Sequence, residues 1–189
     1  MQRFHQLLFV VSLVALSWFV MMAVHEFGHV SGAIITGGSI ERVVLYPLTI
    51  SHTDVSPNPH PAIVVWLGPV IGCVLPLAAF VTVPRRLTVV RNVTQFFAGF
   101  CLIANGAYIS MGSVDGIGDS GEILRTGTPL WLMLAFGAVA ISQGLYLWHR
   151  LGSLKIFIHD PSVVVPRTAY VVFGLLVVIV VAGFTISPR

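Results

Sequence analysis

Residues 7–29 read LLFVVSLVALSWFVMMAVHEFGH, and this stretch decides how the rest of the chain is interpreted. Its first eighteen residues, Leu7 to Val24, carry no charge. A run of that length and composition is a candidate for a helix that crosses a bilayer. The motif His25-Glu26-Phe27-Gly28-His29 follows at once. Because ionisable side chains in or beside a membrane span are costly, they are functional candidates by default.

The motif has the pattern His-Glu-x-x-His. Residues four apart on a helix lie about 40° from each other around the axis, so His25 and His29 can present their ring nitrogens to one ion. Glu26 lies a quarter turn aside, within reach of a water at that ion. Two imidazole ligands beside a carboxylate that accepts a proton from water are typical of zinc proteases. The pattern therefore predicts one zinc ion per chain, with Glu26 as the catalytic base.

Composition favours a membrane protein. The 189 residues are 56% hydrophobic and 9% charged, whereas about a quarter of the residues in a soluble domain are charged. The net charge of +3 does not indicate a nucleic-acid partner, because most of the basic residues lie at the ends of apolar runs, where membrane topology places them. Cys73 and Cys101 both fall inside apolar runs, which favours buried thiols over a metal pair or a disulfide.

The predicted fold is an all-α polytopic membrane protein with about five transmembrane helices and a short membrane-associated β-strand or hairpin after the first. Ser39 to His52 is the strand-like segment, since it is rich in β-branched and aromatic residues, and Pro47 restricts it to an edge or a bulge. We expect a single domain over residues 1–189, with a core at 7–128 and additional helices at 129–189. The expected spans are Leu7 to Val24 (continuing as helix to about Ile35), Ala62 to Val83, Val93 to Met111, Pro129 to Trp148 and Thr168 to Ile186.

Basic residues predict how the chain is oriented in the membrane. Five spans place seven of them on the side of the N-terminus and three on the other side. The positive-inside rule then predicts a cytoplasmic N-terminus and an outward-facing loop after the motif. The expected location is the cell membrane. The seven are Arg3, Arg85, Arg86, Arg91, Arg150, Lys155 and Arg167, and the three are Arg42, Arg125 and Arg189.

A catalytic zinc ion takes three protein ligands, so two histidines are not enough. Asp115 and Asp119 follow the third span in a glycine-rich stretch, and five spans place them on the same side as His29, with Asp160 on the opposite side. A carboxylate is an acceptable zinc ligand, and either aspartate could serve. Asn105 lies inside the third span, where a buried amide bonds a substrate backbone or ties two helices together.

Three motifs in this order resemble the site-2 protease family of intramembrane zinc metalloproteases, in a small form without PDZ or CBS domains. The resemblance covers roughly Leu7 to Arg125. After the histidine motif comes Gly68-Pro69-Val70-Ile71-Gly72 at the second span, and then Asn105 with Asp119-Ser120-Gly121-Glu122-Ile123-Leu124.

The resemblance implies an activity and a set of partners. Asp119 would be the third zinc ligand, with Asp115 as its rival, and Asn105 would contact the substrate. Ser39 to His52 would hold an unwound substrate segment. The chain would hydrolyse a peptide bond in or near a transmembrane segment of a membrane protein, within the lipid bilayer and with a regulatory membrane partner. The alternatives are a catalytically silent membrane protein that binds metal or a helix, and a membrane-bound zinc protease that cleaves soluble peptides.

Overall fold

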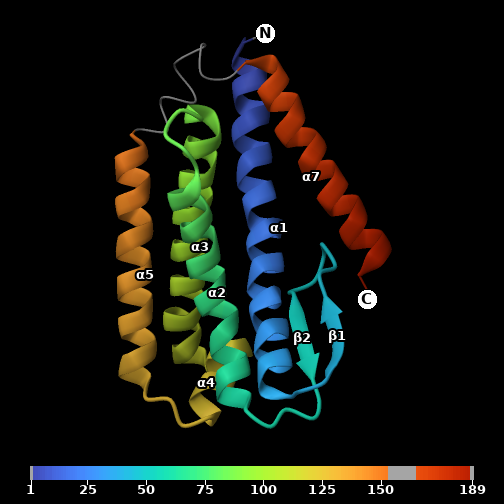
Figure 1. Ribbon diagram of the computed structural model, residues 1–189, viewed down its shortest axis with the longest axis vertical. Coiled ribbons are helices and arrows are strands. Elements are labelled where there is room, and N and C mark those ends of the chain that lie inside the picture. The colour runs from blue at the N-terminus through green and yellow to red at the C-terminus, as the bar shows by residue number, and fades with distance from the viewer. Residues whose placement is uncertain (1, 153–164, 188–189) are drawn as a thin grey trace.

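The computed structural model describes residues 2–152 and 165–187 (Figure 1). Five helices in this part of the chain are long and apolar enough to cross a membrane, which confirms the predicted class of helical membrane protein at that level. They are α1 (Gln2–Thr36), α2 (Pro61–Thr82), α3 (Thr88–Asp115), α5 (Leu130–Leu151) and α7 (Pro166–Ile186).

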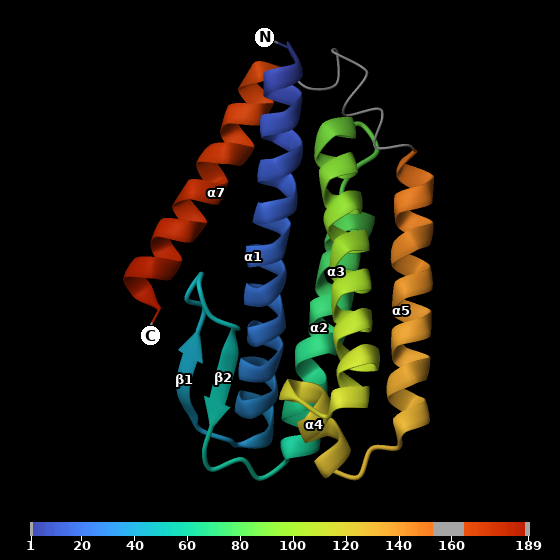
Figure 2. The same ribbon diagram turned by 180° about the vertical axis from the view of Figure 1, so that it is seen from behind.

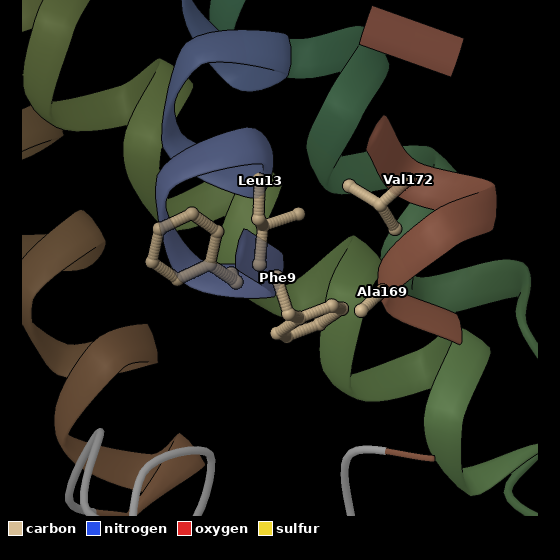
Figure 3. Close-up of a cluster of buried hydrophobic side chains, with 5 residues drawn as sticks. Phe9, Leu13, Ala169 and Val172 are labelled. Atoms are coloured by element: carbon tan, nitrogen blue, oxygen red, sulfur yellow. The ribbon is translucent and has the colours of Figure 1, made fainter. Parts of the chain in front are cut away.

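Helices α1, α2 and α3 form the centre of the bundle, and α5 and α7 pack on its two sides. Helix α1 packs along α2, α2 along α3, and α3 along α5, while α7 packs on the other side of α1. Near the N-terminus of α1, Phe9 and Leu13 contact Ala169 and Val172 of α7 (Figure 3). Further along, α7 diverges from α1 (Figure 1). The space that opens between the two helices is where the β-hairpin lies.

The segment after α1 forms an antiparallel hairpin of β1 (Ile40–Val44) and β2 (His52–Val55). The sequence predicted a strand-like segment over Ser39 to His52, but the first strand stops at Val44. Pro47 then lies in a turn, because proline cannot donate a hydrogen bond to a strand ladder, and the chain returns as β2. The hairpin is thus made of two short strands, and the predicted segment covers the first strand, the turn and only the first residue of the second strand.

Helix α7 holds the turn of the hairpin. The amide of Leu45 donates a hydrogen bond of 2.7 Å to Oγ of Ser187, which immediately follows α7. The rings of Tyr46 and Phe184 meet edge to face with their centroids 5.0 Å apart. The hairpin is therefore fixed between α1 on one side and the C-terminal end of α7 on the other.

A short helix, α4 (Gly118–Arg125), folds back beneath α2 and α3 (Figure 2). The reversal depends on Gly116 and Gly118, whose φ angles of +64° and +55° lie in the left-handed region that only glycine adopts at little cost. Helix α3 continues to Asp115, beyond the Met111 at which the apolar run ends, so Asp115 is helical and Asp119 lies in the first turn of α4.

Different segments of the chain lie at the two ends of the bundle (Figure 1). The start of α1, the α2–α3 connection and the start of α7 lie at one end, and the hairpin and α4 lie at the other. This is the arrangement assumed in the count of basic residues, although Lys155 and Arg189 lie outside the described residues. The side of the membrane that each end faces stays a prediction.

Both cysteines are buried and free, Cys73 in α2 and Cys101 in α3. Cys73 packs with Leu102 and Ala140, and Cys101 packs with Met21 and Met22. The prediction of buried thiols is confirmed, and each serves as a small apolar side chain between helices.

Candidate metal centre

Three side chains from two distant parts of the chain converge near the C-terminal end of α1. Nε2 of His25 lies 2.7 Å from Oδ2 of Asp119, and Nε2 of His29 lies 3.3 Å from the same oxygen. The three ligand atoms all lie within 4.8 Å of one another. Both histidines are buried, whereas the Asp119 side chain keeps 23% of its surface exposed. This group could hold a metal ion.

The second nitrogen of each ring faces an oxygen that can only accept a hydrogen bond. Nδ1 of His25 donates to Oδ1 of Asn105 at 2.6 Å, and Nδ1 of His29 donates to the carbonyl of Val64 at 2.9 Å. The orientation of the Asn105 amide follows from its other end, since Nδ2 donates to the carbonyl of Cys101 at 2.9 Å. Each neutral ring therefore carries its proton on Nδ1 and presents a lone pair at Nε2.

This arrangement fits a cation better than it fits protons. Both Nε2 atoms face the same oxygen, Oδ2 of Asp119, so protons alone satisfy both contacts only if at least one of the two rings becomes an imidazolium ion. That charge would be buried, with the centroid of the other imidazole 4.9 Å away. A cation among the three ligand atoms removes that conflict. Two neutral imidazoles with one carboxylate suit zinc and other divalent transition metals.

The distances can be compared with those of a tetrahedral site. Two ligands that each lie about 2.0–2.1 Å from a tetrahedral zinc ion are about 3.3 Å apart. The contact between His29 and Asp119 already has this length, at 3.3 Å. The contact between His25 and Asp119, at 2.7 Å, would have to open by about 0.6 Å.

The electrostatic surroundings keep Asp119 ionised. Burial opposes the charged form of this carboxyl, but in the metal-free site hydrogen bonds from Nε2 of His25 and His29, when these rings are protonated there, outweigh burial and hold its pKa below its ordinary value. The ionised carboxylate is the form that binds a metal ion.

Helix α4 is attached to α3 so that Asp119 points toward α1. The amide of Asp119 donates to the hydroxyl of Tyr108 at 3.2 Å, and the hydroxyl of the fully buried Ser120 donates to the carbonyl of Tyr108 at 3.1 Å. Asp115, the rival candidate, is exposed at the end of α3 and does not belong to the ligand group. Tyr108 and Ser120 were not singled out from the sequence, where nothing distinguishes them from other polar residues of these helices.

Glycines let α2 pass directly against the site. A Cβ built on Gly28 would overlap the backbone of α2 at Leu67 and Gly68. A Cβ on Gly68 would overlap the His29 imidazole, and one on Gly72 would lie 2.7 Å from Oδ1 of Asn105. The glycine motif of the second span thus forms the wall against which both the histidines and Asn105 rest.

Glu26 lies beside the ligand group rather than in it. Its side chain is 3% exposed, and it accepts a hydrogen bond of 2.8 Å from the hydroxyl of Thr53 on β2. The sequence pattern predicted the role of Glu26 but not this contact, because a threonine in a strand-like segment carries no distinguishing signal. Asn105, which was expected to contact substrate or to tie helices together, is 1% exposed and links α3 to α1 through His25.

Two cavities of opposite character meet at this site. An apolar cavity of about 310 Å³ lies between α1, α3 and the hairpin turn, and its walls include Met21, Met22 and Ala104 together with Glu26 and Asp119. A polar cavity of about 540 Å³ lies between the hairpin, α2 and α4, and is lined among others by His29, Thr53, Asp54, Asn58, Asp119 and Glu122. Asp119 borders both cavities, so the candidate metal centre can be reached from an apolar side and from a polar side.

Comparisons of the chain with protein-family models, with curated proteins and with solved structures found no match.

Proposed function

We propose that this chain is an intramembrane zinc metalloprotease that hydrolyses a peptide bond in or near a transmembrane segment of a membrane protein. One observation carries the proposal: His25, His29 and Asp119 converge in a chain with five membrane-type helices, and Glu26 borders the same apolar cavity as His25 and Asp119. The order of the three motifs, which resembles the site-2 protease family, supports it.

His25, His29 and Asp119 would hold the metal ion. Hydrogen bonds from Nδ1 of each ring, to Asn105 and to the carbonyl of Val64, keep both Nε2 lone pairs aimed at the same point. When bound, a zinc ion supplies a Lewis acid that polarises the peptide carbonyl and lowers the pKa of water to about 7.

Glu26 would move the proton. Its carboxylate accepts a proton from the attacking water while the water oxygen bonds to the carbonyl carbon of the substrate. Glu26 then delivers that proton to the amide nitrogen as the carbon–nitrogen bond breaks. The products are one fragment that ends in a carboxylic acid and one that begins with an amine.

The two cavities support a substrate that comes from lipid. The apolar cavity, with Met21, Met22 and Ala104 in its walls, suits a hydrophobic peptide segment. The polar cavity on the side of Thr53 and Asn58 suits water. Because a helix hides its carbonyls in its own hydrogen bonds, a transmembrane substrate would have to unwind locally before it is cleaved. The cell membrane, a cytoplasmic N-terminus and a regulatory membrane partner belong to the same proposal.

The deciding experiment compares Glu26→Gln with wild type in lipid nanodiscs. The probe is a quenched-fluorescent peptide with one polyleucine span interrupted by a central Gly-Ser pair, and bound zinc is measured by elemental analysis. We expect Glu26→Gln to abolish cleavage while keeping one zinc ion per chain. The control Asp115→Asn, at an exposed aspartate at the end of α3, should cleave like wild type.

The alternatives predict other outcomes. A catalytically silent metal-binding protein would keep zinc in both variants and cleave nothing even as wild type. A protease for soluble peptides would cut a water-soluble version of the probe and leave the membrane-embedded one intact. Cleavage of the embedded probe that persists in Glu26→Gln would refute the proposed role of this residue.

A further inference from the structure

We propose that Thr53, on the second strand of the hairpin, is a positioning residue for Glu26. Its hydroxyl fixes one carboxylate oxygen and so determines which oxygen is left to take a proton from water. The inference rests on the proposed function, because the positioning matters only if Glu26 acts as the base.

The contact is specific and buried. Oγ1 of Thr53 donates a hydrogen bond of 2.8 Å to Oε2 of Glu26, which is 3% exposed. In the described part of the chain, Thr53 is the one residue whose side chain is hydrogen bonded to this carboxylate. A hydroxyl has a single proton, and here it is donated to Oε2 at an ordinary hydrogen-bond distance. Oε1 of Glu26 keeps its lone pairs for another donor.

The chemistry needs such a constraint. A base must lie within hydrogen-bonding distance of the proton it takes, and its lone pair must point at that proton. A glutamate side chain turns about three bonds, so a carboxylate held at neither oxygen would spread over several orientations. With Oε2 held by the hairpin, Oε1 is the oxygen left to take the proton, and Glu26 lines the cavity that it shares with His25 and Asp119.

The hairpin places Thr53 for this task. Successive side chains of a strand point to opposite faces, and the neighbouring Asp54 pairs with Arg42 on the exposed face at 2.8 Å. Thr53, opposite Val43 in the ladder, therefore points the other way, toward α1. The first strand leads into the turn that Ser187 holds through the amide of Leu45. The orientation of Glu26 thus depends on how the hairpin is seated between α1 and α7.

The test compares three variants of the full-length protein in nanodiscs. Thr53→Val removes the hydroxyl but keeps the shape of the side chain, and Thr53→Ser keeps the hydroxyl. Thr49→Val is the matched control, because Thr49 lies in the turn of the same hairpin and its exposed hydroxyl donates only to the carbonyl of Tyr46. All four proteins should contain one zinc ion per chain by elemental analysis.

On the quenched-fluorescent probe described above, Thr53→Val should lower kcat about 10–100-fold, the usual loss when a partner that orients a functional group is removed. Its KM should stay within about twofold of wild type. Thr53→Ser should recover most of the rate, and Thr49→Val should behave as wild type. A kcat of Thr53→Val equal to wild type would overturn the proposal.

A second measurement needs no turnover. The protein is loaded with Co²⁺, and binding of acetohydroxamate is followed by visible absorption, because a carboxylate aimed at the metal accepts the hydroxamate proton. Thr53→Val should weaken binding about 10-fold or more, and Thr53→Ser should restore it.

The two proposals fail in different ways. If Glu26→Gln abolishes cleavage and weakens hydroxamate binding while Thr53→Val changes neither, the inference about Thr53 is wrong and the proposed function stands. If Glu26→Gln itself changes neither measurement, the proposed function is wrong as well.

Discussion

Replacing Gly68 by alanine adds a single methyl group where the metal centre has no room for it. The new Cβ would overlap the His29 imidazole and would lie 2.9 Å from Nε2 of His25, whereas ordinary van der Waals contact begins at 3.4 Å. Relief requires the His25 ring to move by about 0.5 Å and the His29 ring to move further, or α2 to withdraw from α1.

That displacement exceeds what a zinc site tolerates. Ligand distances hold to within about 0.2 Å, so a shift of about 0.5 Å at one ring weakens coordination directly. We expect the zinc affinity of Gly68→Ala to fall at least about 10–100-fold, the range seen when residues around a metal site are disturbed, which is about 1.4–2.8 kcal/mol of binding free energy. Withdrawal of the helix would instead lower the free energy of unfolding by about 1–3 kcal/mol.

Zinc affinity is measured by competition with a chromogenic chelator, and stability by thermal unfolding of the metal-free protein. The control is Gly174→Ala in α7, where a Cβ meets nothing within 4 Å. Alanine is a better helix former than glycine by about 1 kcal/mol, so the control should bind zinc as wild type does and be no less stable. If Gly68→Ala bound zinc and unfolded as the control does, the close approach of α2 to the histidines would be refuted.

Three further outcomes are expected. Asp119→Asn should weaken zinc binding by at least about 100-fold, since a direct ligand contributes more than the partners around it, while Asp115→Asn should bind as wild type in the same chelator titration. Asn105→Ala leaves Nδ1 of His25 without its acceptor and should weaken zinc binding about 10–100-fold with little change in helicity by circular dichroism. Arg42→Ala removes an exposed ion pair with Asp54 and should change the free energy of unfolding by no more than about 1 kcal/mol without affecting zinc; a larger loss would show that the pair holds the hairpin in place.

The part of the site that lies on one helix could be predicted from the sequence. His25, Glu26 and His29 are joined by the fixed turn of an α-helix, so their spacing alone places them together. Asp119 is 94 residues from His25 along the chain, and only the resemblance favoured it over Asp115. Choosing between them by geometry requires the length of α3 and the two left-handed glycines after it, neither of which follows from the apolar pattern.

Other contacts carried no usable signal. Thr53 is a common residue in a segment whose composition predicted a strand but not where the strand would turn. The acceptor for His29 is the backbone carbonyl of Val64, and every residue has a carbonyl. The five long helices were predictable because lipid imposes length and apolarity on each one separately, whereas the contacts between them depend on how small residues such as Gly68 let the backbones approach.

The opposite polarity of the two cavities bears on which molecules the site would select. A peptide that is soluble in water gains little by moving into a recess walled by Met21 and Met22, whereas a chain already dissolved in lipid loses nothing by entering it. Partition of a peptide between lipid and water would then limit which substrates reach the site, before any preference for particular residues at the cleaved bond. If the chain is the protease proposed above, its turnover should depend on the lipid around it as well as on the sequence of the substrate.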